Sequence, residues 1–225
     1  MIDSSLRKTI SLRVHQDGRV LVKAPKHLSA LQIKEFLKRK SSWITRRQDY
    51  FRAMRLRHPV KELRNGESFS VLGRHYRLRL SGPGDKIDKR CRIEGRRLVV
   101  PSGSAWSCLS DWYGAITRRR VQALLNRHAP ALSVRPGAVR VTEQSGRWAS
   151  CAPNDDIRCN WRLSMMPPAI IEYIVVHELC HLVVRTHSPR FWATLKSVLP
   201  DFSKSRDWLR DNGPGIAFST SFTQK

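Results

Sequence analysis

The chain has 225 residues, 40% of them hydrophobic, which is enough apolar material for one large or two small domains with a buried core. Its longest apolar runs, such as residues 170–176, are far shorter than the roughly 20 residues that a membrane span needs, and charged residues near the N-terminus leave no room for the apolar segment of a secretory signal. The sequence therefore predicts a cytoplasmic protein without a membrane-spanning helix.

Charge is the extreme feature of the composition. The 42 Lys and Arg residues far exceed the 18 Asp and Glu residues, giving a formal net charge of +24. The excess is concentrated in residues 1–97, which contain 26 basic and 9 acidic side chains. Such a field favours polyanionic partners, either nucleic acid or acidic protein segments, and the alternative is a solvated basic surface.

The five cysteines are odd in number and include no C-x-x-C pair. Reduced thiols in a reducing compartment are therefore expected. A disulfide between Cys151 and Cys159, brought together by a short hairpin, is the alternative.

The first half of the chain is predicted to be rich in strands. Alternating apolar residues on both sides of a turn at Gly18 predict a β-hairpin over residues 9–24. Apolar residues at helical spacing, with many Lys and Arg between them, predict one long amphipathic helix over residues 29–57. Residues 69–100 alternate again, and with the hairpin they predict an antiparallel sheet with one packed helix.

The second half is predicted to be a helix-rich unit with a small sheet. The turn-forming segment 101–104 marks the boundary, so the predicted domains are residues 1–101 and 102–225. In chain order, the patterns of the second domain predict a helix over 109–125, strands over 138–142 and 157–163, and helices over about 168–184, 189–199 and 203–210. The two halves together predict an α+β fold.

The sharpest motif is His177-Glu178-Leu179-Cys180-His181, an H-E-x-x-H pattern inside an apolar helical stretch. Positions four apart lie about 40° apart around a helix and about 6 Å apart along it, so both imidazoles can bind one tetrahedral Zn²⁺ ion. Glu178 lies beside them, where it can act as the general base toward water at the metal. The sequence therefore predicts a zinc-dependent hydrolase.

A catalytic zinc site needs a third protein ligand and an open fourth position. His187 is the candidate, because it follows His181 by six residues where the chain is expected to leave the first helix. Asp201 or Asp207 is the alternative, provided that the last segments fold back over the site. Two other interpretations of the motif are a pair of buried helix histidines without a metal and a purely structural zinc site, although structural sites are mostly rich in thiolates.

These residues belong to a longer set of ordered matches. The chain resembles the YgjP-like metallopeptidases, a zincin family related to the SprT-like proteases, over nearly its whole length. The matching segments are residues 7–14 with the Asp17-Gly18 turn, 147–151, 160–163, Pro167-Pro168, 177–182, 187–192 and 199–202. The resemblance implies Zn²⁺ bound by His177, His181 and His187, Glu178 as general base, a helix-rich zincin-like catalytic unit, and a protein or peptide substrate.

Two positions qualify the resemblance. Ala149 stands where the family commonly has Gly, which affects local turn geometry. The spacing to His187 equals that of metzincins, but Val184 occupies the position where metzincins have a Gly for a left-handed turn, so the metzincin label is rejected.

Several other side chains have weaker predicted roles. The strand over residues 157–163 is expected to offer an exposed edge with which an extended peptide pairs. The candidates for stabilising the oxyanion are Arg162, Arg185, Arg190 and Tyr173, among which the sequence does not choose. Core filling is the preferred interpretation of Cys180 and of three tryptophans near the motif, Trp148, Trp161 and Trp192.

The competing hypothesis is a nucleic-acid-binding protein in which the basic residues 1–97 dominate and the metal site is vestigial. A combined version, in which DNA recruits a protease to bound proteins, is also open. The sequence predicts no oligomeric state and no particular peptide substrate.

Overall fold

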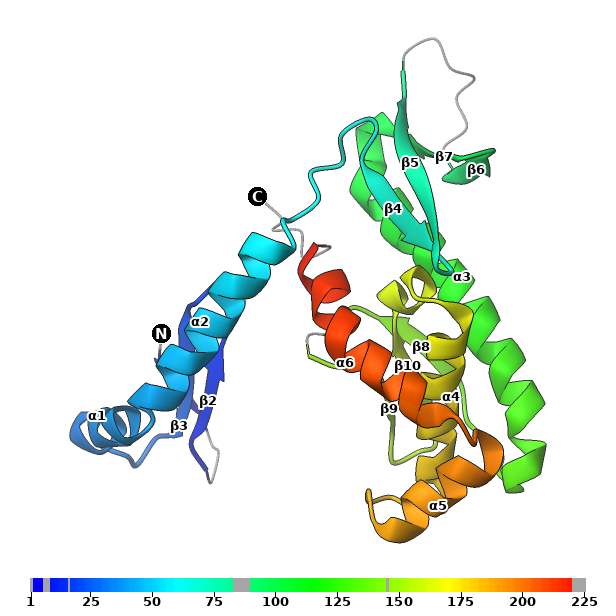
Figure 1. Cartoon of the computed structure of the whole chain (residues 1–225). Coiled ribbons are helices and arrows are strands. Elements are labelled where there is room, and N and C mark those ends of the chain that lie inside the picture. The colour runs from blue at the N-terminus through cyan, green and yellow to red at the C-terminus, as the bar shows by residue number, and fades with distance from the viewer. Residues whose placement is uncertain (1, 6–8, 16, 83–89, 145, 220–225) are drawn as a thin grey trace. The chain divides into compact units, whose positions relative to one another are not determined.

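The structure is a computed structural model that describes residues 2–5, 9–15, 17–82, 90–144 and 146–219 (Figure 1). The chain forms two compact units, Met1–Val60 with Ala217–Lys225, and Lys61–Ile216. Both units combine helices with small sheets, and the predicted α+β class is confirmed. The division between the units falls after Val60, whereas the sequence predicts a boundary after residue 101.

The first unit packs two helices against a three-stranded sheet. The strand order is β1-β3-β2, with β1 parallel and β2 antiparallel to β3. The single predicted helix is divided at Lys40, whose backbone angles of φ −96° and ψ 3° leave the α-helical region. The elements are β1 (Ile2–Ser5), β2 (Ser11–Val14), β3 (Val20–Pro25), α1 (Ala30–Arg39) and α2 (Ser41–Arg57).

The second unit begins with a four-stranded sheet in the order β4-β5-β7-β6. Its strands are β4 (Ser68–Val71), β5 (Arg74–Ser81), β6 (Arg92–Glu94) and β7 (Arg97–Pro101). The predicted sheet is antiparallel, but β5 and β7 pair in parallel. Phe69, Leu78 and Leu98 are buried in one core with Tyr113 and Trp161, which lie beyond the predicted boundary. This shared core explains why β4–β7 belong to the unit that carries the H-E-x-x-H motif.

The long helix α3 (Ala105–His128) runs past this sheet and then along a second sheet and α4 (Figure 1). The second sheet has the order β8-β10-β9, with β10 parallel to β8 and antiparallel to β9. Its apolar residues share the largest core with α3 and α4. The remaining elements are η1 (Ser102–Ser104), η2 (Pro130–Leu132), β8 (Val139–Thr142), β9 (Ala149–Cys151), β10 (Ile157–Asn160), η3 (Trp161–Met165), α4 (Pro168–Val183), α5 (Pro189–Val198) and α6 (Phe202–Ser219).

The strand that was expected to present a free edge is the middle strand of this sheet. β10 is hydrogen-bonded on both sides, and Trp161–Met165 continues from it as a 3₁₀ helix. The expectation of an exposed edge at residues 157–163 is therefore wrong. The strand that contacts α4 is β9, which in the described part of the chain pairs with β10 alone.

All five cysteines have free thiols. Cys151 lies opposite Ile157 in the β9–β10 register, while Cys159 lies opposite Ala149, so the alternative Cys151–Cys159 bridge is not formed. In the described segments, no helix is both long enough and apolar enough to cross a membrane.

A different cysteine pair is placed for cross-linking. Sγ of Cys91, before β6, lies 3.0 Å from Sγ of Cys108 on α3, whereas a disulfide bond is about 2.05 Å long. We expect oxidised glutathione to link these two thiols, because only a small approach is required. Mass spectrometry of the intact chain should show the loss of two hydrogen atoms. The Cys108→Ser variant should show either an unchanged mass or the added mass of a glutathione. An intramolecular disulfide in that variant would contradict the assignment.

Candidate metal centre

Helix α4 and the loop after it position the three histidines. Pro168 opens the helix at its first turn, where the missing N–H costs no hydrogen bond. His177 and His181 follow on the same face, and the helix ends at Val184, whose backbone is extended. The short loop then carries His187 back toward the helix before Ser188 caps α5.

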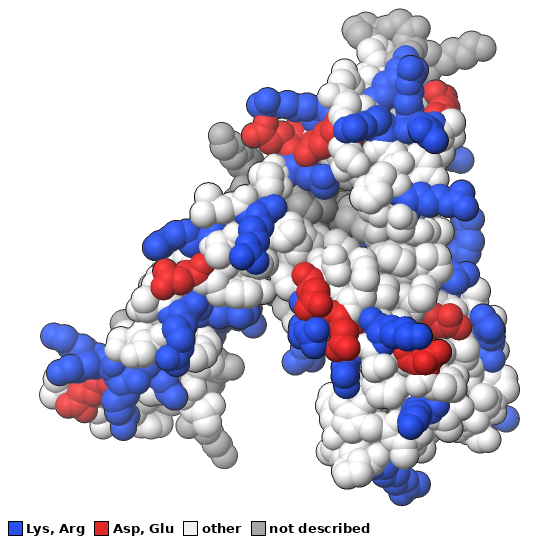
Figure 2. Space-filling model, viewed as in Figure 1, with Lys and Arg blue, Asp and Glu red and all other residues white. Residues whose placement is uncertain are grey.

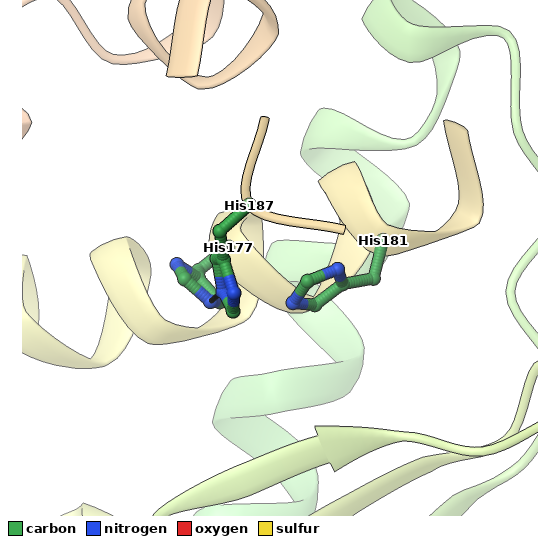
Figure 3. A group of neighbouring side chains, drawn as sticks. All are labelled: His177, His181 and His187. Atoms are coloured by element: carbon green, nitrogen blue, oxygen red, sulfur yellow. Dashed lines mark hydrogen bonds between the residues drawn. The ribbon is translucent and has the colours of Figure 1, made fainter. Parts of the chain in front are cut away.

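The three imidazole rings converge on one point (Figure 3). Each offers one nitrogen, and the three nitrogens lie within 4.8 Å of one another. Nε2 of His187 is 2.9 Å from Nε2 of His177. Because a tetrahedral zinc with bonds of about 2.0–2.1 Å separates its nitrogen ligands by about 3.4 Å, the donor set fits a single zinc ion with little adjustment.

Burial favours the neutral form of two of the three imidazoles. It lowers the pKa of His177 to about 4, with smaller contributions from the neighbouring His181 and His187. Burial also lowers the pKa of His181. Nδ1 of His181 lies 3.2 Å from the carbonyl oxygen of Val184, and with the proton on Nδ1 this contact leaves Nε2 free to bind a metal. Both rings are therefore ready to act as ligands at neutral pH.

One aromatic side chain supports all three rings. Phe191 on α5 is fully buried, and its ring centroid lies 4.9, 4.7 and 4.8 Å from those of His177, His181 and His187. Trp192 stacks on His187 with centroids 5.7 Å apart. These contacts restrict the orientation of the rings, as a preorganised metal site requires.

Glu178 is the one buried acidic residue of α4, with 7% of its surface exposed. Burial raises its pKa to about 7, and the backbone N–H of Cys151 on β9 and the charge of Arg147 offset part of this increase. A carboxyl group with a pKa near neutrality can accept and return a proton at working pH. The carboxyl group of Glu178 therefore lies near the N–H of Cys151 on the edge strand β9, which favours its charged form.

In the metal-free protein, Glu178→Gln should raise the free energy of unfolding at pH 8 by about 1–3 kcal/mol. The folded pKa of about 7 exceeds the unfolded value near 4.5, so above pH 7 the wild type buries a charge that Gln lacks. The gain should shrink as pH falls from 7 toward 4.5, where Glu178 is protonated in both states. Denaturant unfolding of the wild type and the variant at pH 8 and pH 4.5 measures this gain. An equal difference in free energy of unfolding at the two pH values would contradict this account.

The other candidate ligands and polar groups are engaged elsewhere. Asp207 pairs with Arg206 and Arg210, and Asp201 pairs with Lys204, so neither joins the histidine group. Among the oxyanion candidates, Arg162 is buried on the Trp161 ring and pairs with Glu143, while Arg185 pairs with Asp155. Arg190 is exposed at the start of α5. The ring centroid of Tyr173 lies 5.9 Å from that of His177.

Sequence reasoning missed two contributors to the site and was right about core filling at two positions. It gave no role to Phe191 or to the N–H of Cys151, although both lie in segments that carry the family resemblance. A signal for Phe191 was present, since it is an aromatic residue in the first turn of a helix that directly follows His187. Cys180 and Trp161 are core residues, as predicted.

Comparison with known families decides the classification. The YgjP-like metallopeptidase domain matches residues 8–212. The chain belongs to the YgjP-like metallopeptidase family. It is therefore a metallopeptidase, and the predicted resemblance is confirmed.

Two solved structures resemble part of this YgjP-like chain. The metallopeptidase zymogen of Pyrococcus abyssi abylysin shares 26% sequence identity, with 41% of this chain and 93% of that chain covered and a TM-score of 0.39. The metallopeptidase zymogen of Methanocaldococcus jannaschii jannalysin shares 15% identity, with 41% and 95% covered and a TM-score of 0.38. Among curated proteins, no relative matches the chain.

Proposed function

We propose that this metallopeptidase uses zinc held by His177, His181 and His187 to hydrolyse peptide bonds. The observation that carries the proposal is the convergence of three imidazole nitrogens within 4.8 Å, with Glu178 next in sequence on the same helix. Three nitrogen ligands and one open position are the pattern of catalytic rather than structural zinc. When bound, zinc supplies Lewis acidity toward water and the peptide carbonyl group.

Glu178 acts as the general base and then as the general acid. Its carboxyl group accepts the proton of the attacking water and later delivers that proton to the amine that leaves. Burial supports this role, because a pKa of about 7 makes proton uptake and release similarly favourable near neutral pH. The N–H of Cys151 favours the charged form of the carboxyl group, which is the form that accepts the proton.

The free edge of β9 is the element that positions the peptide. The backbone N–H of Asn160 donates to the carbonyl oxygen of Trp148, and the backbone N–H of Ala152 donates to the carbonyl oxygen of Asp156. These bonds show that the backbone groups of residues 148 and 152 point toward β10 and the residues that lead into it. By alternation, the N–H and C=O of Ala149 point away from β10. An extended substrate can pair with them and so lie alongside Glu178.

Removal of the metal tests the proposal. Treatment with 1,10-phenanthroline should abolish hydrolysis of an unfolded protein substrate. After the chelator is removed by dialysis, one equivalent of zinc should restore hydrolysis, because the donor set can hold a single ion. The non-chelating isomer 1,7-phenanthroline is the matched control and should leave hydrolysis unchanged. Full hydrolysis by protein shown by metal analysis to be zinc-free would contradict the proposal.

A further inference from the structure

A second candidate site lies on the sheet β4–β7, in segments that contribute no ligand to the metal centre. Here the surface forms a pocket of about 590 Å³. The lining contains no carboxylate; it consists of Ser68, Arg74, His75, Tyr76, Arg77, Gly95 and Arg96. The arrangement therefore concentrates positive charge within one concave surface.

Sheet topology brings the arginines together from separate parts of the chain. Arg74 and Arg77 lie at the start of β5, and Arg96 directly precedes β7, which pairs with β5 in parallel. The amide of Arg77 donates to the carbonyl of Arg96 at 2.9 Å, so these two residues are held side by side by the backbone. The pocket is thus built on hydrogen-bonded strands rather than on a free loop.

The guanidinium groups of Arg74 and Arg96 are not neutralised within the described chain. Neither has an acidic partner there, although nearby arginines do: Glu94 pairs with Arg79 and Arg92. Arg77 donates to the carbonyl oxygen of Gly66 at 3.0 Å, which fixes its position without cancelling its charge. Figure 2 shows the same imbalance, with Lys and Arg side chains outnumbering acidic ones over the part of the molecule that carries β4–β7.

We propose that this pocket binds the phosphodiester backbone of single-stranded nucleic acid, with Arg74 and Arg96 as the phosphate ligands. The planar fork of a guanidinium group matches phosphate oxygens and binds them through two parallel hydrogen bonds. The pocket is large enough for a nucleotide rather than for one carboxylate side chain. The exposed ring of His75 in its lining offers a stacking surface to a base, which an acidic peptide does not need.

The proposal is independent of the peptidase function, since no pocket residue belongs to the metal centre. Because the proposed contacts are made to the phosphates of the nucleic acid, the affinity should not depend on nucleotide sequence and should fall steeply as the salt concentration rises. Because β4–β7 and the metal centre belong to the same unit, nucleic acid held here brings its bound proteins to the unit that cleaves peptides.

The test uses the full chain and a fluorescein-labelled single-stranded oligonucleotide of about 16 nucleotides, followed by anisotropy across a series of salt concentrations. Arg74→Ala combined with Arg96→Ala should raise Kd about tenfold or more and lower the magnitude of the salt slope by about 1.4. Arg119→Ala combined with Arg135→Ala is the matched control. It removes two exposed charges from the same unit outside the pocket and should change Kd less than about threefold.

Exposed arginines tolerate substitution, so both double variants should fold, and unchanged hydrolysis of a short peptide verifies this. An equal loss of affinity in the two double variants would overturn the proposal in favour of a diffuse basic field. Absence of oligonucleotide binding by the wild type would also overturn it. A peptide of Asp and Glu with the same charge that displaces the oligonucleotide as well as unlabelled oligonucleotide does would also overturn the proposal, and would assign the pocket to acidic proteins instead.

Discussion

Glu178→Gln is expected to lower kcat for peptide hydrolysis by about 10²- to 10⁴-fold while the zinc content stays unchanged. The Gln side chain has the shape of Glu and can still accept the hydrogen bond from Cys151. It cannot take a proton from water, so it removes the chemistry and leaves the geometry of the site intact. Steady-state kinetics on a fluorogenic peptide, together with metal analysis of the same preparation, measure both quantities.

The control is the same substitution six residues earlier on α4. Glu172 accepts a hydrogen bond from His128 and forms an ion pair with Arg127. It takes no part in the proposed proton transfers. Glu172→Gln should weaken this cluster and lower the melting temperature, but leave kcat near the wild-type value. If the two variants lose kcat to a similar extent, the effect comes from destabilised α4 and Glu178 is not the base.

Local spacing was sufficient to predict that the candidate metal ligands lie together. Two histidines four residues apart share a face of any α-helix, so the geometry of His177 and His181 depends only on α4 forming. The third ligand required one further assumption, that the chain leaves the helix before His187. The extended backbone at Val184 satisfies it.

Non-local pairing was not predictable in the same way. The alternation of residues 157–160 indicates a strand but says nothing about its neighbours, so β10 was placed at an edge although it lies between β8 and β9. The position of β9 beside Glu178 likewise follows from tertiary packing. The same limitation explains the domain boundary. Pro101 and Gly103 mark a turn, but only the packing of Tyr113 against β4–β7 shows that this turn lies within one unit.

His187→Ala is expected to weaken zinc binding by at least about 100-fold and to abolish hydrolysis at stoichiometric zinc. His187 is the exposed member of the group and lies in a loop, so its removal should change the metal-free free energy of unfolding by no more than about 0.5 kcal/mol. A competition titration against a zinc-binding dye separates loss of affinity from loss of fold.

His27→Ala is the matched control for that titration, because it removes an exposed imidazole from the first unit and should leave zinc affinity unchanged. The alternative ligands are Asp201, directly before α6, and Asp207 on α6. Both are held in ion pairs, so neither is placed to replace His187. A His187→Ala chain with wild-type affinity would show that the ion is held by other groups. A loss of zinc affinity with an unchanged free energy of unfolding of the metal-free protein would assign His187 as the third ligand, supplied by the loop between α4 and α5.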